Sequence, residues 1–222
     1  MAPETTVVFE GIAVTEPVPG AQADGQARTP PEYDIVLVGA SAGGLAAIST
    51  LLGALPAGFP VPVVIVQHLD PRHASLMADI LSRRTALRVE EATDGVATEP
   101  ATVYVAPPDD HLLVNPDGRL SLSHSDPVHF VRPAADLLFR SGAGAYLGRV
   151  IGVVLTGTGS DSNMGVRAID EAGGTVIAQD PDSAEFAGMP QAAIATGGVK
   201  HVLPLEEIAP ALVALVTRGR LR

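Results

Sequence analysis

The strongest constraint on the fold is an apolar run that leads directly into a serine flanked by glycines. Residues 34–38 have the composition of a buried strand, and the sequence Gly-Ala-Ser-Ala-Gly-Gly follows at residues 39–44. A helix pattern begins there and continues to about residue 54. A tight turn from a strand into a helix exposes the Ser41 hydroxyl beyond the sheet, beside the unpaired amides of the first helical turn.

Strand and helix signals alternate along the rest of the chain. Strands are predicted at about 34–38, 61–67, 102–106, 150–155 and 174–178, and helices at about 44–54, 74–83, 133–143, 163–172 and 205–217. Continuous runs of Val, Ile and Leu are typical of parallel strands that are covered on both faces. We therefore expect an α/β fold with a doubly wound, mostly parallel sheet and helices on both faces. Residues 111–114 and 120–123 flank Asn-Pro-Asp-Gly-Arg and predict an added antiparallel hairpin.

The beginning of the chain differs in composition from the remainder. Residues 1–33 contain Gly, Gln and Pro clusters that favour a flexible N-terminal tail, although residues 6–14 are apolar enough for an edge strand or a docking peptide. Residues 34–222 read as a single domain without internal repeats. With 222 residues, 46% of them hydrophobic, the chain can build one sizeable core.

Composition excludes several classes of function. The chain has no cysteine, which rules out disulfides, thiolate zinc sites and cysteine nucleophiles. A net charge of −11 with scattered basic residues argues against nucleic-acid binding. No His/Asp/Glu cluster has metal-ligand spacing, so we predict no metal and no cofactor. Because we find neither an apolar run of about 18 residues nor a signal-peptide pattern, we expect a cytoplasmic protein without membrane insertion.

Two further strand ends carry residues that complement a nucleophilic serine. His68 follows the strand at 61–67, and Asp161 follows the strand at 150–155 through Thr-Gly-Thr-Gly-Ser. The carboxyl ends of parallel strands share one edge of a sheet, so Ser41, His68 and Asp161 can meet there. An imidazole that takes the serine proton, and a carboxylate that orients the imidazole, constitute a catalytic triad for acyl transfer.

Other interpretations of these residues remain open at this point. The order Ser, His, Asp differs from that of an α/β-hydrolase, in which the acid precedes the histidine. The glycine-flanked turn could bind a phosphate or dinucleotide through helix amides, Asp161 could cap the next helix, and His68 could be a structural histidine. The remaining histidines fall in loops, the hairpin or a helix start: His73, His111, His124, His129 and His201.

Several segments resemble the catalytic domain of the CheB methylesterases, the chemotaxis protein-glutamate methylesterases. The resemblance extends from about Asp34 to Leu215. It rests on Val38–Gly44, Gln67-His68, Val105–Leu112, Arg132–Phe139, Leu155–Asp161 and Gly188-Met189-Pro190, in this order.

The resemblance implies a specific activity and a specific set of residues. Ser41, His68 and Asp161 would form the triad, the backbone amides of Ala42 and Thr158 would bind the oxyanion, and Met189 would belong to the substrate cleft. The substrate would be γ-methyl glutamyl esters on the cytoplasmic helices of methylated chemoreceptors or a related signalling protein. Some members of the family also deamidate receptor glutamines.

The chain departs from the family pattern at four places. Ala42 replaces a usual hydroxyl residue and Thr158 a common Met, although in both cases the backbone amide is retained. Ser162 replaces the usual Gly, which would strain the turn if this position needs a positive φ. Leu69-Asp70 replaces Met-Pro after the histidine.

The family's usual phosphoreceiver domain needs about 100–120 residues, and only about 33 precede Asp34, so we expect a stand-alone catalytic domain. Two alternatives are an esterase or amidase of the same mechanism in another signalling pathway, and a catalytically idle interaction domain.

Overall fold

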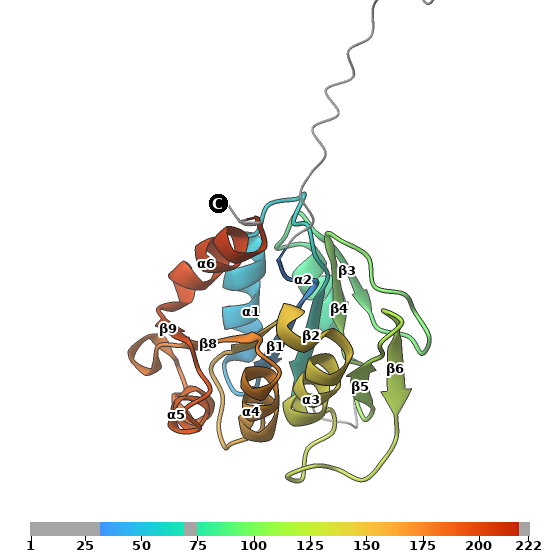
Figure 1. Cartoon of the computed structure of the whole chain (residues 1–222). Coiled ribbons are helices and arrows are strands. Elements are labelled where there is room, and N and C mark those ends of the chain that lie inside the picture. Colours follow the sequence, from blue (N-terminus) through green and yellow to red (C-terminus); the bar gives the residue numbers. More distant parts are fainter. Residues whose placement is uncertain (1–31, 69–74, 218–222) are drawn as a thin grey trace, which may run out of the picture.

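The structure is a computed structural model that describes residues 32–68 and 75–217. The predicted tail with its apolar segment 6–14, and the positions Leu69, Asp70 and His73, lie outside the described residues. Seven parallel strands form the central sheet in the order β3-β4-β2-β1-β7-β8-β9 (Figure 1). Its strands are β1 (Ile35–Ala40), β2 (Val63–Gln67), β3 (Arg88–Glu91), β4 (Thr102–Val105), β7 (Val150–Val154), β8 (Thr175–Gln179) and β9 (His201–Leu203).

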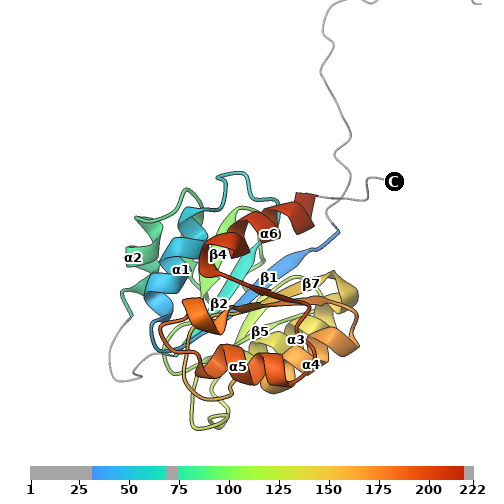
Figure 2. The same ribbon diagram turned by 90° about the vertical axis from the view of Figure 1, so that its left-hand side faces the viewer.

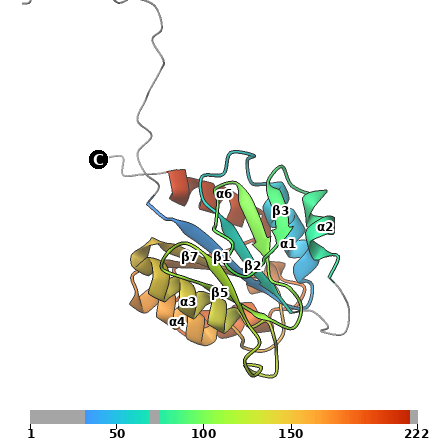
Figure 3. The same ribbon diagram turned by 90° about the vertical axis from the view of Figure 1, so that its right-hand side faces the viewer.

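Helices cover both faces of this sheet, as the sequence predicts. They are α1 (Gly44–Gly53), α2 (Met77–Ser82), α3 (Ala135–Tyr146), α4 (Asn163–Glu171), α5 (Gly188–Ala195) and α6 (Leu205–Thr217), with short 3-10 turns at Leu147–Arg149 and Pro181–Ser183. Helices α1, α2 and α6 lie on one face, and α3, α4 and α5 lie on the other (Figures 2 and 3). None of the described helices is long and apolar enough to cross a membrane.

Each face of the sheet packs its own apolar core, because side chains alternate between the faces along every strand. In β1, Val36 and Val38 face the α1/α2/α6 layer, whereas Ile35 and Leu37 face the α3/α4/α5 layer. All six residues of β1 are buried. A central strand that is covered on both faces explains why this segment shows no polar alternation in the sequence.

The five predicted strands and five predicted helices are confirmed, but three elements were not predicted. Strands β3 and β9 are the two edges of the sheet, and they are too short and too polar to show an apolar run. Helix α5 begins with Gly-Met-Pro, which resembles a turn in the sequence. A proline in the first turn of a helix is tolerated because the amide it lacks would have no partner there.

The predicted hairpin also forms, with β5 (His111–Val114) antiparallel to β6 (Leu120–Ser123). It makes a separate two-stranded sheet and does not extend the parallel one. Leu112, Val114 and Leu120 are buried in the same apolar cluster as Leu138 of α3. The hairpin therefore packs on α3, and so it belongs to the layer that carries one wall of the candidate site.

The strand order creates a crevice at one edge of the sheet. From β1 the chain builds outward through β2, and it later returns to the other side of β1 with β7. The order reverses between β1 and β7, and the loops that follow these two strands lie side by side at the carboxyl edge, which is the usual ligand site of such sheets. Ser41 follows β1 and Asp161 follows β7 across this crevice, and His68 follows the neighbouring β2.

Candidate active site

Ser41 lies on the turn between β1 and α1, as the sequence predicts. Its amide donates to the carbonyl of Thr156, 3.0 Å away, which ties the turn to the loop after β7. Gly43 precedes the helix with φ 73°, a left-handed conformation that glycine adopts without a steric cost. The Ser41 side chain is half-buried and lines a surface groove.

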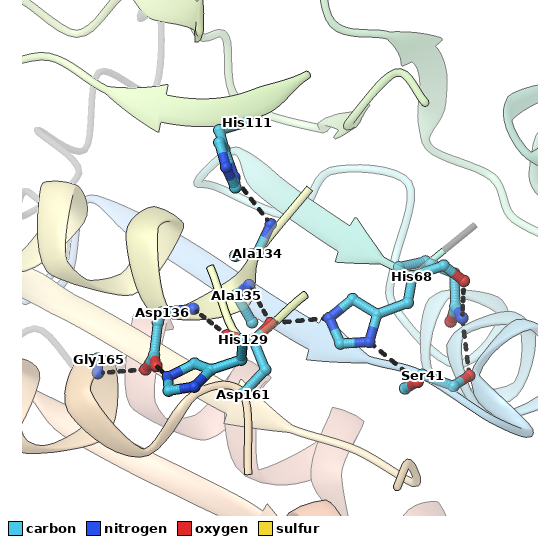
Figure 4. A network of polar contacts seen from close by, with 10 residues as sticks. Ser41, His68, His111, His129, Ala134, Ala135, Asp136, Asp161 and Gly165 are labelled. Atoms are coloured by element: carbon cyan, nitrogen blue, oxygen red, sulfur yellow. Dashed lines mark hydrogen bonds and ion pairs between the residues drawn. The ribbon is translucent and has the colours of Figure 1, made fainter. Parts of the chain in front are cut away.

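His68 bridges Ser41 and Asp161. Its Nδ1 lies 3.0 Å from the Ser41 Oγ, and its Nε2 lies 2.7 Å from the Asp161 Oδ2 (Figure 4). A carboxylate can only accept, so the proton of the neutral imidazole belongs on Nε2. The unprotonated Nδ1 then faces the hydroxyl, where it can accept the proton of Ser41.

Asp161 is 4% exposed, and three donors surround its carboxylate. Besides His68, the amide of Ala135 donates to Oδ2 at 2.6 Å and the amide of Asp136 donates to Oδ1 at 3.0 Å. Both amides lie in the first turn of α3, where unpaired donors and the helix dipole stabilise a negative charge. Asp161 thus caps a helix, but it caps α3 and not the helix that follows it in the sequence.

Asp136 makes the reciprocal contact. Its Oδ1 accepts from the amide of Gly165 in the first turn of α4, 2.8 Å away, so α3 and α4 are each capped by an aspartate from the other's N-terminal region. Burial raises the pKa of Asp136, and the neighbouring Asp161 adds to this effect while the Gly165 amide opposes it. The Nε2 of His129 lies 3.2 Å from the second carboxylate oxygen (Figure 4).

The start of α3 is itself held by the hairpin region. His111 is fully buried on β5, and its Nδ1 accepts from the amide of Ala134 at 3.1 Å. Arg132 donates through Nη2 to Asp109 at 2.6 Å. These contacts connect two motifs of the sequence, Val105–Leu112 and Arg132–Phe139. Together the two motifs fix the position of the α3 amides that donate to Asp161.

Two backbone amides point to an anion site beside Ser41. Within residues 32–68 and 75–217, the amides of Ala42 and Thr158 donate to no other protein group. Ala42 is half-buried and Thr158 exposed, and they lie on the two loops that flank the crevice. Free amides on both sides of a nucleophile can stabilise the oxyanion that forms when it attacks a carbonyl.

The structure corrects the expectation for Met189. This side chain is fully buried in the α3/α4/α5 core, beneath the loop after β7. A Cβ atom on Gly157 would lie 2.3 Å from its sulfur atom and 2.8 Å from the Ser41 Cβ, so the absence of a side chain at Gly157 lets Met189 pack close beneath Ser41. Met189 therefore supports the floor of the site and does not line an open cleft.

The groove that Ser41 does line runs along α1 and α2. It has a volume of about 690 Å³ and includes the exposed aliphatic side chains of Leu45 and Ile80. Arg84, two residues after the end of α2, is the one charged residue among the described residues that line it. The sequence offered no signal for this groove, because α1 and α2 are brought together only by the packing of β1 beside β2.

Ser162 has the positive φ that its place in the sequence suggested. It precedes α4 with φ 117° and ψ −17°, and its buried hydroxyl has no hydrogen-bond partner within the described residues. The carboxylate of Asp161 nevertheless keeps all three of its contacts. The strain at Ser162 is therefore accommodated without displacing Asp161.

Comparison with known proteins agrees with this architecture. A family model described as CheB methylesterase matches residues 36–212. The protein-glutamate methylesterase FrzG of Myxococcus xanthus is 42% identical over 89% of the chain, which spans 59% of the length of FrzG. A putative protein-glutamate methylesterase/protein-glutamine glutaminase of Leptospira interrogans is 40% identical over 82% of the chain and 95% of its own length.

A solved structure shows the same fold. The crystal structure of the Thermotoga maritima CheB methylesterase catalytic domain superposes with a TM-score of 0.80 at 37% identity, and the match covers 83% of this chain and 99% of that one. The range matched by the family model includes the strand ends that carry Ser41, His68 and Asp161. The chain belongs to the CheB methylesterase family.

Proposed function

We propose that the protein is a protein-glutamate methylesterase that hydrolyses γ-methyl glutamyl esters on the cytoplasmic helices of chemoreceptors. The observation that carries the proposal is the unbroken contact from Ser41 through His68 to Asp161, at 3.0 and 2.7 Å. The substrate class follows the relatives, which are named protein-glutamate methylesterases, and the Leptospira protein is also named a protein-glutamine glutaminase. On this proposal residues 34–222 act as the catalytic domain, in the cytoplasm, and the chemistry needs no cofactor.

The first half of the reaction acylates Ser41. The Nδ1 of His68 takes the hydroxyl proton as Oγ attacks the ester carbonyl, and Asp161 stabilises the imidazolium that results. The amides of Ala42 and Thr158 donate to the developing oxyanion. Collapse of this intermediate breaks the bond to the methoxy group, which leaves as methanol with the proton from His68.

The second half releases the product. A water molecule enters in place of methanol, His68 removes its proton, and attack on the acyl-enzyme gives glutamate and free Ser41. A glutamine side chain can follow the same route with ammonia as the leaving group. The groove beside α1 gives a receptor segment access to Ser41, with Leu45 and Ile80 as apolar contacts and Arg84 available to an acidic neighbour of the ester.

Methanol release from a methylated receptor fragment tests the proposal. Ser41→Ala should lower the rate by at least about 10³-fold while circular dichroism shows an intact fold. Ser125→Ala is the control, because Ser125 is exposed on a loop and its hydroxyl makes no hydrogen bond to a described residue. A Ser41→Ala variant that keeps more than a tenth of the activity would disprove the assignment.

A fluorophosphonate probe separates the mechanism from the substrate. It should label Ser41 in the wild-type chain, as mass spectrometry of the labelled peptide would show. Labelling without methanol release would indicate the same chemistry on another ester or amide. Absence of labelling together with absence of methanol release would indicate a binding domain.

A further inference from the structure

A buried glutamine lies directly behind the candidate oxyanion site. Gln67 is the last residue of β2 and is 7% exposed. Its Nε2 donates to the carbonyl of Ser41 at 2.7 Å and to the carbonyl of His68 at 3.1 Å. The side chain therefore connects the backbone of the proposed nucleophile with the backbone of the proposed base, and it touches neither reacting atom.

The carbonyl that Gln67 binds belongs to the same peptide unit as the Ala42 amide. A trans peptide is planar, and its C=O and N–H bonds point in opposite directions. A hydrogen bond that holds the Ser41 oxygen on the inner side therefore aims the Ala42 N–H at the crevice. The same bond polarises the peptide, which strengthens its amide as a donor.

The backbone around Gln67 leaves room for this side chain. The amide of Gly44 also donates to the Ser41 carbonyl, at 2.9 Å. A Cβ atom on Gly44 would lie 1.9 Å from the Gln67 Oε1 and 2.8 Å from the Ala40 Cβ, so any other residue at this position would displace the glutamine amide and also press on the end of β1. Glycine at this position thus serves the glutamine side chain.

The second proposed oxyanion donor has an equivalent support. The Thr158 amide shares its peptide unit with the Gly157 carbonyl, and that carbonyl accepts from the amide of Met189 at 2.8 Å. The donor here is an amide of the first turn of α5, which has no hydrogen-bond partner within its own helix. The peptide of each proposed oxyanion donor is therefore held by a hydrogen bond to its carbonyl, on the side opposite the amide.

We propose that Gln67 is a positioning residue that orients and polarises the Ala42 amide for the oxyanion, through its hydrogen bond to the Ser41 carbonyl. The inference rests on the proposed function, since it presumes acyl transfer at Ser41. A glutamine with a purely structural role would affect the stability of the fold and the binding of the substrate in its ground state. A positioning residue acts chiefly on the transition state, in which the oxyanion is present.

Gln67→Met tests the proposal, because methionine has a similar length and volume but cannot donate. Loss of a complete oxyanion donor costs about 10²–10³-fold in kcat, and a misdirected amide should lose part of that, about 10–100-fold. The assay is hydrolysis of p-nitrophenyl acetate and of a methylated receptor fragment, and KM should change less than about threefold. Affinity for phenylboronic acid, which forms a tetrahedral adduct with serine, should fall in parallel with kcat/KM.

Gln179→Met is the matched control. Gln179 is also a buried glutamine at a strand end. Its Oε1 accepts from the Thr156 amide and its Nε2 donates to the Ser183 carbonyl, so it does not bind the peptide of either proposed oxyanion donor. We expect it to lower the melting temperature as much as Gln67→Met does, but to reduce kcat less than about threefold. Equal losses of kcat and of boronate affinity in both variants would overturn the inference.

Gly44→Ala provides an independent test that leaves Gln67 chemically intact. It should lower kcat by displacing the glutamine amide, and it should add little to Gln67→Met in a double-mutant cycle. Additive losses would overturn the inference, and so would a Gly44→Ala variant that keeps the wild-type kcat and boronate affinity. The second outcome can be measured even if Gln67→Met fails to fold. If Ser41→Ala still hydrolyses p-nitrophenyl acetate, the proposed function fails. If Ser41 is essential but Gln67→Met and Gly44→Ala both have wild-type activity, only the proposed role of Gln67 fails.

Discussion

Replacing Ser162 by glycine should stabilise the protein. Ser162 has φ 117°, it is fully buried, and its hydroxyl lacks a partner among the described residues. A non-glycine residue at such a φ costs about 1–3 kcal/mol, which Ser162→Gly would remove. Removing an unsatisfied buried hydroxyl gains about 1–3 kcal/mol more.

Two opposing contributions reduce this gain. Glycine loses more chain entropy on folding, which costs about 0.5–1 kcal/mol. The void left by two heavy atoms costs about the same. The net expectation is a gain of about 2 kcal/mol in the free energy of unfolding, which corresponds to a rise of about 4–8 °C in the melting temperature for a domain of this size.

Urea denaturation and thermal melting measure this change, and Ser162→Ala divides it into its parts. Alanine removes the hydroxyl but keeps the Cβ atom, so it should recover only the hydroxyl contribution, about half of the gain. Ser160→Gly, on the exposed part of the same loop, controls for an effect of glycine by itself. If Ser162→Gly is no more stable than Ser162→Ala, the backbone at this position is not strained and the argument is refuted.

Four further outcomes are expected. Asp161→Asn should lower kcat by about 10³–10⁴-fold. It should also destabilise the fold, because all three groups around the carboxylate donate hydrogen bonds and the new amide nitrogen must face one of these donors. A loss of methanol release below tenfold would contradict this expectation. Asp136→Asn should raise the urea midpoint at neutral pH. Because the pKa of Asp136 is raised in the folded protein, this carboxyl contributes its full stability below the ordinary pKa of 3.8, and the contribution is lost as the pH rises through the folded pKa. The stability advantage of the variant should therefore grow with pH, and an advantage that is constant from about pH 4 to 8 would refute the argument. Arg84→Glu should raise KM for an acidic receptor peptide more than Arg83→Glu does, because only Arg84 lines the groove, and equal effects would exclude a local contact. Deletion of residues 1–31 should leave folding intact and change the rate by less than tenfold, as circular dichroism and the methanol assay would show.

The arrangement of a parallel sheet between two layers of helices could be predicted from local patterns in the sequence. Runs of Val, Ile and Leu such as residues 35–38 identify strands that are buried on both faces, and the alternation with helices implies parallel connections. The same reasoning placed Ser41, His68 and Asp161 at strand ends. Parallel strands force their carboxyl ends to one edge, so sequence separation was no obstacle to predicting that these three residues meet.

Elements without a local signature could not be predicted. Strands β3 and β9 form because a neighbouring strand offers unpaired backbone groups, and their own side chains show little preference for a strand. The positions of Asp136, Gln67 and Arg84 around the candidate site depend on packing between segments that are distant in the chain. The burial of Met189 was likewise decided by the packing of α5 under the loop after β7.

The sequence by itself therefore determined the edge of the sheet at which Ser41, His68 and Asp161 lie, and it is the source of the proposal that these groups react. Only the tertiary structure decided how these groups are held: which nitrogen of His68 faces Ser41, which helix Asp161 caps, and which carbonyl Gln67 binds. The physical reason is that apolar periodicity is a local property of the chain. Hydrogen bonds between loops depend on directions that are fixed only when β1, β2 and β7 pack side by side.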